Sequence, residues 1–433
     1  MSLPSQTSSV SVRLSALQKA WNRPEERAAL TKNLRARLPE ILFLAAFVLG
    51  VFRTILSFTA LETDSLKLLT YFSVLLLIVK IVLTRYRPRE LPVMAALLFL
   101  CLLTFYVSRN NAFVFLGFVL LASRNVDLRK VMRASLFTVT ATTFLVVFCS
   151  LTGIVKKYRI FSISRGDTYI YRYGLGFGHP NLLHAMFMIA AALFLYFEFR
   201  RHFLPALLSV GVLNVGMYFL TQSRTGAAAV FCMILLAILY RLPKTSEKAT
   251  RYSGVLFLLI VLTQLALTFT YRKGSPFSDL ADGLLQGRVM QSNYYLQEYH
   301  VSALGHNMVE LGYTGFHYFL DFGYTRLLLN FGWIVLLLYV YANIHTILAF
   351  SARKKPEIVL LIMTFGVVGF GENYIYYIYL NVSMLFFSWL LFGGALYRNR
   401  ALNRLAAWMP LHCKGYVPAR IFLHRHLRRW LEQ

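Results

Sequence analysis

The chain has 433 residues, of which 58% are hydrophobic and 15% are charged, and its mean hydropathy is +0.57. Soluble globular proteins carry about 25% charged residues, so the composition excludes that class and indicates an integral membrane protein. Lys and Arg number 45 against 18 Asp and Glu, which gives a formal net charge of +27. In so apolar a chain the basic residues must lie mainly in loops, and nucleic-acid binding is not expected.

The cysteines do not form a pattern. Cys101, Cys149 and Cys232 fall in apolar stretches, and Cys413 lies in a basic segment. No pair has the spacing of a disulfide framework or a zinc site. We therefore expect neither a metal site nor redox chemistry.

Long apolar runs dominate the chain. A bilayer core about 30 Å thick requires roughly 20 apolar residues per helix. Twelve runs meet or approach this length, and the fourth and eleventh are short enough to be re-entrant. They cover approximately residues 40–60, 66–84, 91–107, 111–123, 134–153, 180–198, 203–221, 224–240, 253–271, 323–349, 357–371 and 376–397.

The distribution of basic residues predicts the orientation of these spans. Twelve spans place both termini on one side. Residues 1–39 hold seven Lys or Arg without the apolar core of a signal peptide, and residues 398–433 hold eight. Alternate loops are also basic, so the positive-inside rule predicts two basic cytoplasmic tails around one transmembrane domain, residues 40–397. Anionic lipid headgroups account for much of this charge. Two long outer loops remain, residues 154–179 and 272–322.

The first outer loop ends in a glycine-rich turn before the sixth span. Glycines at positions 174, 176 and 178 precede His179 and Pro180, and Pro is favourable as the first residue of a helix. Glycines let the backbone approach a ligand, and a helix N-terminus offers free N–H groups. With Arg172 nearby, the segment is a candidate anion cradle; the alternative is a tight turn that only shapes the start of the span.

A short turn, Thr221 to Gly226, joins the seventh and eighth spans and leaves Arg224 near the outer ends of two helices. A cation at such depth should face an anion, carbonyl groups or water. The alternative is that the Arg224 side chain snorkels to lipid headgroups.

The second outer loop predicts a helix from Val289 to His300. At about 100° per residue, Arg288, Ser292 and Tyr295 share one face, and Tyr294 and Glu298 share another. One side could offer a cation and hydroxyl groups to a sugar. The alternative is an amphipathic helix on the membrane surface.

Further polar residues lie at the rims of the last spans. His306 follows a glycine, Asp321 and Tyr324 precede Arg326 at the start of the tenth span, and Glu372 interrupts an apolar hairpin. Charges at such positions are functional candidates. Arg326 could instead form a structural ion pair with Asp321 or Glu372.

Taken together, the outer segments combine four arginines with many tyrosines. Guanidinium groups bind phosphate oxygens in a bidentate manner, and aromatic faces suit sugar rings. The combination favours a polyanionic lipid-linked saccharide as the ligand. The tyrosines are Tyr169, Tyr171, Tyr173, Tyr294, Tyr295, Tyr299, Tyr313 and Tyr324.

Several motifs resemble Wzy-type polysaccharide polymerases, in the superfamily that includes O-antigen ligases. They are Tyr173 to Asn181, the Ser223 to Gly226 turn, the Gly287-Arg288 helix start and Asp321-x-x-Tyr324-x-x-Leu-Leu. The resemblance covers residues 123–392. It implies an all-α polytopic fold of about 12 transmembrane helices, GT-C-like, with short helices in a long outer loop.

The resemblance also implies an activity. The enzyme would join oligosaccharide repeat units, carried on undecaprenyl diphosphate, at the outer face of the cytoplasmic membrane, without nucleotide sugar, metal or other cofactor. An acceptor hydroxyl would attack the anomeric carbon of the donor, and lipid diphosphate would leave. Partners would include the lipid bilayer, a chain-length regulator and a flippase.

The roles that the resemblance assigns fall on two groups of residues. Charge stabilisation and proton transfer fall on Arg172, Arg224, Arg288, His179, His306 and Glu372. Substrate binding falls on Asn181, Tyr173, Tyr294, Tyr295, Glu298, Asp321, Tyr324 and Arg326. The family's Asp-Asn pair appears here as Asp321-Phe322.

Two alternative functions remain. An O-antigen ligase would share the fold and differ in its acceptor. A lipid-linked oligosaccharide flippase or other transporter would place charge at several mid-span positions, whereas Arg53 is nearly the only such residue in this chain.

Overall fold

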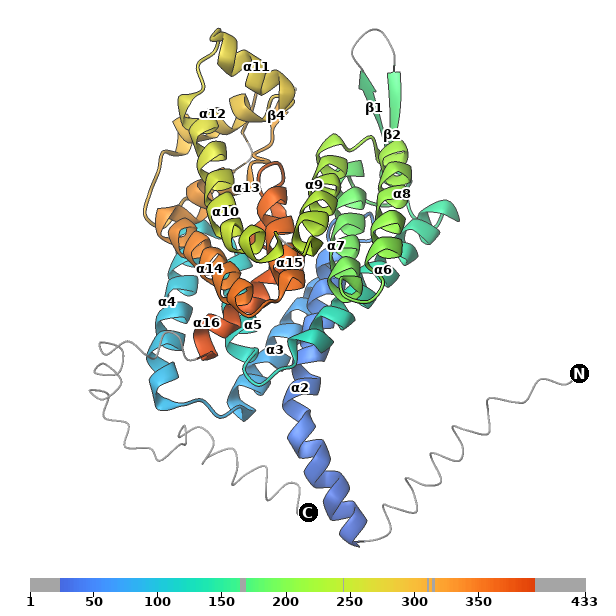
Figure 1. The fold of residues 1–433 in the computed structure, drawn as a ribbon, viewed down its shortest axis with the longest axis vertical. Coiled ribbons are helices and arrows are strands. Elements are labelled where there is room, and N and C mark those ends of the chain that lie inside the picture. The colour runs from blue at the N-terminus through green and yellow to red at the C-terminus, as the bar shows by residue number, and fades with distance from the viewer. Residues whose placement is uncertain (1–23, 164–168, 244, 310, 314–315, 394–433) are drawn as a thin grey trace, which may run out of the picture.

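A computed structural model describes residues 24–163, 169–243, 245–309, 311–313 and 316–393. Residues 1–23 of the predicted N-terminal tail and all of the predicted C-terminal tail, with Cys413, lie outside the described residues. The described chain is mostly helical (Figure 1).

The helices are α2 (Pro24–Leu56), α3 (Lys67–Leu83), α4 (Leu91–Ser108), α5 (Ala112–Ala122), α6 (Leu128–Leu151), α7 (Pro180–Glu198), α8 (Phe203–Thr221), α9 (Arg224–Arg241), α10 (Ser246–Thr270), α11 (Pro276–Leu284), α12 (Arg288–Tyr299), α13 (Gly323–Arg326), α14 (Gly332–Ala352), α15 (Pro356–Val368) and α16 (Ser388–Phe392). Short 3-10 turns are η1 (Asp64–Leu66), η2 (Pro88–Glu90), η4 (Tyr374–Tyr376) and η5 (Val382–Phe387), and a π-helical turn, η3 (Leu327–Phe331), joins α13 to α14.

Two small antiparallel hairpins accompany the helices. Strand β1 (Arg159–Ile163) pairs with β2 (Tyr169–Tyr173), with Arg159 opposite Tyr173. Strand β3 (Leu311–Tyr313) pairs with β4 (Phe316–Tyr318), with Leu311 opposite Tyr318. No strand is predicted from the sequence at these positions, because each strand is short and lies within a loop.

Within the described residues, nine helices are long and apolar enough to cross a membrane. They match nine of the twelve predicted spans. Three shorter apolar helices, Ala112–Ala122, Pro356–Val368 and Val382–Phe392, coincide with the fourth, eleventh and twelfth. The twelfth was expected to begin near residue 376. Its first residues instead form a 3-10 turn and an irregular segment, in which the Asn381 amide donates to the Ile375 carbonyl at 2.7 Å.

The exterior of the helices is apolar. Phe99, Phe137 and Val212 are 67%, 75% and 72% exposed and lie on α4, α6 and α8. Exposed apolar surface of this extent is costly in water and marks a membrane-contacting surface. The long apolar helices therefore define a membrane-embedded, polytopic protein.

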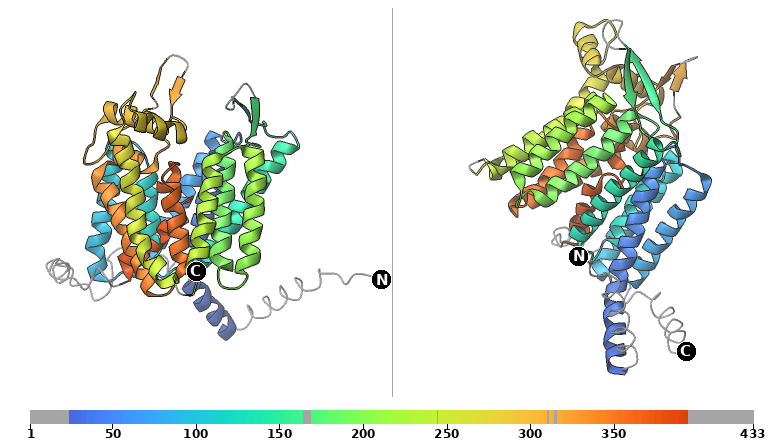
Figure 2. Two further views of the ribbon diagram at one scale, coloured as in Figure 1. Left: turned by 45° about the horizontal axis from the view of Figure 1, so that its top comes forward. Right: turned by 90° about the vertical axis from the view of Figure 1, so that its right-hand side faces the viewer.

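Both long connections project from the same end of the bundle. Hairpin β1–β2 and the group formed by α11, α12 and the β3–β4 hairpin lie together at the top of Figure 1 and again in the left view of Figure 2. We call this end the hairpin end. The opposite end carries ion pairs between connecting segments, which are Arg124 with Glu90, Lys354 with Glu247 and Arg200 with Glu357.

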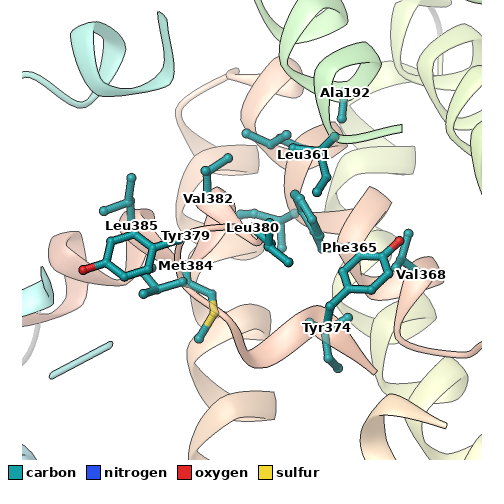
Figure 3. Close-up of a cluster of buried hydrophobic side chains, with 14 of the residues drawn as sticks. Ala192, Leu361, Phe365, Val368, Tyr374, Tyr379, Leu380, Val382, Met384 and Leu385 are labelled. Carbon is teal, nitrogen blue, oxygen red and sulfur yellow. The ribbon is translucent and has the colours of Figure 1, made fainter. Parts of the chain in front are cut away.

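The centre of the core lies around the segment that follows α15. Tyr374, Leu380 and Leu385 are buried among Phe365 of α15 and Ala192 of α7 (Figure 3). Because this irregular segment is surrounded by apolar side chains, its position is fixed. It supports the polar residues just before it.

Gln264 of α10 holds this region from the other side. Its amide oxygen accepts from the backbone N–H groups of Tyr324 and Thr325 at 2.9 and 3.1 Å, and its amide nitrogen donates to the carbonyls of Gly369 and Phe370, both at 2.7 Å. The residue is fully buried. One side chain therefore ties α10 to the start of α13 and to the end of α15.

Candidate functional site

Arg288 is the centre of the candidate site. It is the first residue of α12, after Gly287, whose φ of +80° glycine adopts without strain. The side chain is buried and has three partners. Nη1 donates to Thr225 Oγ1 at 2.8 Å, Nε lies 3.2 Å from Asp321 Oδ2, and Nη2 lies 3.3 Å from Glu372 Oε1. The three partners come from the starts of α9 and α13 and from the segment after α15.

The backbone at Gly371 allows this approach. A Cβ added at this position would lie 2.6 Å from Thr225 Cγ2 and 3.1 Å from Arg288 Nη1. Any larger residue would therefore push α9 or the guanidinium away from the segment that carries Glu372.

The sequence predicted a possible ion pair of Arg326 with Asp321 or Glu372. Arg288 is the cation that contacts both carboxylates. Arg326 Nη1 instead donates to the Leu320 carbonyl at 3.4 Å. The start of α12 lies beside the segment before α13, which brings Arg288 to Asp321. The two residues are far apart in the sequence, so the spacing of residues along the chain does not predict this contact.

A second cationic group lies beside the first. Arg172, on β2, donates through Nη2 to Asn181 Oδ1 at 2.6 Å and through Nε to the Thr221 carbonyl at 3.0 Å. Burial, and next the charge of nearby Arg288, lower the pKa of Arg172, and Glu372 opposes this effect. Cations that repel one another are a favourable arrangement for binding an anion.

His179 closes the N-terminus of α7. Its Nδ1 accepts from the Asn181 N–H at 3.1 Å, so a neutral ring carries its proton on Nε2. Burial, with the charges of Arg172 and Arg288, lowers the pKa of His179 to about 4. In this arrangement His179 is a neutral hydrogen-bond donor, which argues against the expected role as proton acceptor.

The pKa values of the two carboxylates, Glu372 and Asp321, are shifted upward, whereas that of His179 is shifted downward. Burial raises the pKa of Glu372 to about 7 against the opposing effect of Arg288, and Asp321 raises it further. Burial also raises the pKa of Asp321, again against Arg288. Near neutral pH Glu372 can therefore accept a proton, which makes it the best placed general base of the site.

A cavity of about 950 Å³ adjoins these residues. Its polar end is lined by Asn181, Arg224, Thr225, Arg288 and Glu372. Its walls continue along apolar side chains of α9, α10 and α15, which include Leu235, Leu236, Leu256, Ile260 and Val367. The cavity therefore offers two arginines and one carboxylate at one end, and a long apolar wall.

Three helix N-termini meet at the polar end. Asn181, Arg224 and Arg288 all line the cavity, and each lies in the first turn of its helix, α7, α9 and α12. A helix N-terminus carries about half a positive elementary charge. The helix dipoles therefore add to the charges of the arginines and make the polar end suitable for a polyanion.

The remaining predicted site residues do not line the cavity. Tyr324 is fully buried and its hydroxyl donates to the Gly366 carbonyl at 2.6 Å. The hydroxyl of buried Tyr295 donates to the Tyr318 carbonyl and accepts from the Leu311 N–H, so it holds the β3–β4 hairpin. Tyr294 and Glu298 are exposed on the outer face of α12. Tyr173 is half-buried at the end of β2.

His306 is also remote from the cavity lining. Its backbone N–H donates to the Asn330 carbonyl at 3.3 Å and its carbonyl accepts from Asn330 Nδ2 at 2.9 Å. Gly305 and Gly332 lie so close to the opposing backbone that a Cβ at either would overlap it. The predicted Gly305-His306 motif thus joins a loop to the π-helical turn η3.

Two important residues were not selected from the sequence. Thr225 was recognised only as part of a turn, and it holds Arg288 in place. Gln264 was not predicted to have a structural role, although a polar side chain within an apolar span indicates that it has hydrogen-bond partners inside the bundle. In the described part of the chain, no three His, Cys, Asp or Glu side chains are grouped as metal ligands.

The fold and the site define a polytopic membrane protein with a cationic, partly apolar cavity near the hairpin end. Comparison with known proteins adds no family to this description: no family model, no curated protein and no solved structure matches the chain.

Proposed function

We propose that the protein is a metal-independent glycosyltransferase that polymerises undecaprenyl-diphosphate-linked oligosaccharide repeat units at the outer face of the cytoplasmic membrane. In this proposal twelve segments cross the membrane in a GT-C-like arrangement, both termini lie in the cytoplasm, and the hairpin end faces outward. The motif resemblance to Wzy-type polymerases supports the choice of reaction.

The observation that carries the proposal is the amphipathic cavity. A prenyl diphosphate has two to three negative charges at one end of a long hydrocarbon chain. The polar end, with Arg224, Arg288 and three helix N-termini, matches the diphosphate, and the apolar wall between α9 and α10 matches the hydrocarbon.

The arrangement suits glycosyl transfer. The acceptor hydroxyl oxygen forms a bond to the anomeric carbon of the donor, and the bond from that carbon to the diphosphate oxygen breaks. The electron pair remains on the diphosphate, whose growing charge Arg288 and Arg224 stabilise. Glu372 takes the hydroxyl proton, and its pKa of about 7 suits that role.

The charge distribution supports the proposed orientation. The connections at the end opposite the hairpins carry clusters of basic residues, at positions 85–89, 129–133, 200–201 and 353–355. Basic loops remain in the cytoplasm. The polar end of the cavity then lies toward the outer leaflet, where lipid-linked repeat units are used.

The decisive experiment supplies purified protein, in lipid nanodiscs and without added metal, with one defined lipid-linked repeat unit. We expect products of two or more repeats, and we expect Arg224→Ala and Arg172→Ala to leave single units on the lipid. Lys273→Ala is the matched control, because Lys273 is exposed at the same end and outside the cavity lining. Absence of chain extension by the unaltered protein, or full-length polymer from both arginine variants, would contradict the proposal.

A further inference from the structure

A second cavity lies on the other side of the segment that carries Glu372. It measures about 660 Å³ and is formed by the hairpin ends of α2, α3 and α5. Its lining combines polar side chains, which include Arg53, Ser57, Glu62, Lys67, Asn111 and Tyr377, with apolar ones. Aromatic side chains such as Phe58, Phe115 and Phe118 supply much of the apolar wall. Hydroxyl, amide and charged groups beside aromatic faces are typical of a saccharide site.

The two cavities share one wall. Gly371, Glu372 and Tyr374 line the first cavity, and Tyr377 and Tyr379 line the second. The segment of residues 371–379 therefore has a cavity on either side.

The loop after α2, which borders the second cavity, is also hydrogen-bonded to the glycine-rich turn beside the first site. The Ala60 N–H donates to the Gly176 carbonyl at 3.1 Å, and the Gly178 N–H donates to the Phe58 carbonyl at 2.9 Å. The loop after α2 is thus bonded to the glycine-rich turn that leads into His179. Occupancy of the second cavity can therefore influence the N-terminus of α7.

Arg53 and Glu62 form a charged pair in the lining of this cavity. The Arg53 Nη2 lies 3.5 Å from Glu62 Oε1, and the two side chains are 19% and 50% exposed. The guanidinium can therefore donate to a ligand oxygen in the cavity, and Glu62 can accept from a ligand hydroxyl.

The position of the cavity favours a ligand that is attached to the membrane. Tyr71, which lines it, is 69% exposed, and Leu68 and Phe72 beside it on α3 are 67% and 51% exposed. This surface belongs to a candidate span. A headgroup bound in the cavity can therefore remain attached to a lipid at the edge of the bundle.

We propose that the second cavity binds the saccharide of a second lipid-linked repeat unit, the one whose hydroxyl is glycosylated. This inference rests on the proposed function. The first cavity then holds the donor by its diphosphate, and the second holds the acceptor by its sugar. The segment of residues 371–379 lies between them, and Glu372 faces the first cavity, so the reacting end of the acceptor saccharide extends past this segment to Glu372 and the donor.

Binding measurements with two probes test this assignment. The first probe is the tritiated repeat-unit oligosaccharide, released from its lipid, and the second is undecaprenyl diphosphate without sugar; both are titrated against full-length protein in nanodiscs. We expect Arg53→Gln to weaken oligosaccharide binding about tenfold, the factor for losing one hydrogen bond to a charged group. Undecaprenyl diphosphate should bind as before, and Arg224→Ala should show the reverse pattern.

Two further variants make the result decisive. Asn111→Leu fills the second cavity at a residue whose side chain does not cap its own helix, so the fold should tolerate the change. Lys157→Gln alters an exposed charge at the same end and serves as the control. Unchanged oligosaccharide binding in Arg53→Gln and Asn111→Leu, or none in the unaltered protein, would overturn the assignment. Failure of Arg224→Ala to weaken diphosphate binding would instead count against the proposed function.

Discussion

Arg288 Nη2 lies 3.3 Å from Glu372 Oε1, although 84 residues separate the two positions in the sequence. The same guanidinium contacts Asp321 and Thr225. Burial raises the pKa of Glu372, and Arg288, which is shared with a second carboxylate, lowers it only in part. The pKa of Glu372 therefore remains above its usual range, near 7, where a base for sugar hydroxyl groups is useful.

The first prediction concerns pH. Because the pKa of Glu372 is raised to about 7, its protonated fraction grows as the pH falls below this value. If Glu372 accepts the hydroxyl proton, chain extension should fall about tenfold per pH unit on the acidic side. Glu372→Gln should lower the rate about 10²- to 10⁴-fold and abolish this acidic limb.

Initial rates at pH 5 to 8 with the defined lipid-linked repeat unit are the measurement. Glu198→Gln, at the opposite end of α7, is the control and should keep the limb. An unaltered acidic limb in Glu372→Gln would assign the proton transfer to another group.

The second prediction tests the geometry of Arg288. Lysine keeps the charge but has a single ammonium group, which cannot contact Thr225, Asp321 and Glu372 together. We expect Arg288→Lys to lower the rate of chain extension about 10²- to 10³-fold, as for the loss of a preorganised charge stabiliser. Arg272→Lys changes an exposed arginine at the same end and should have little effect. Equal rates for both variants would mean that charge alone suffices.

The third prediction concerns Gln264. Replacing it by Leu leaves the N–H groups of Tyr324 and Thr325 and the carbonyl of Phe370 without a partner, whereas the Gly369 carbonyl still accepts from the Gly323 N–H. Each unsatisfied buried group costs about 1 to 3 kcal/mol, so the variant should lose about 3 to 9 kcal/mol of unfolding free energy. The melting temperature in detergent is the measurement. Thr263→Ala, at an exposed position of the same helix, should melt like the unaltered protein; identical melting of Gln264→Leu would show that other contacts hold α13.

The fourth prediction compares two glycines with similar backbone angles. Gly305 has φ +80° and Gly274 has φ +85°, but only at Gly305 would a Cβ overlap another backbone segment, at Asn330. A left-handed conformation costs an alanine about 1 to 2 kcal/mol. Gly274→Ala should lose about this amount, and Gly305→Ala should lose more than about 3 kcal/mol because overlap is added. Equal losses in thermal unfolding would show that the loop at Gly305 can move.

Much of the helical architecture could be predicted from the sequence. Apolar runs located nine long helices and three shorter ones within the described residues, because burial in a bilayer imposes length and composition on each span. Pro180 was correctly expected to begin a helix. Arg288, Ser292 and Tyr295 share one face of α12 as expected, and the structure shows that this face is buried. The beginning of the last span was less accurate, because Asn381 stabilises an irregular segment through a contact that no hydropathy pattern contains.

The sequence by itself determined where the apolar helices lie, where charge is concentrated and which arginines lie near helix starts, because these properties depend on neighbouring residues. Only the tertiary structure decided which groups meet. The first turns of α7, α9 and α12 lie around one cavity, and Asp321 and Glu372 both contact Arg288. Tyr324 and His306, by contrast, make hydrogen bonds that hold backbone segments together and do not line the cavity. These contacts join residues that are far apart in the sequence, so they depend on how the helices pack. The packing in turn depends on all the side chains that are buried between the helices.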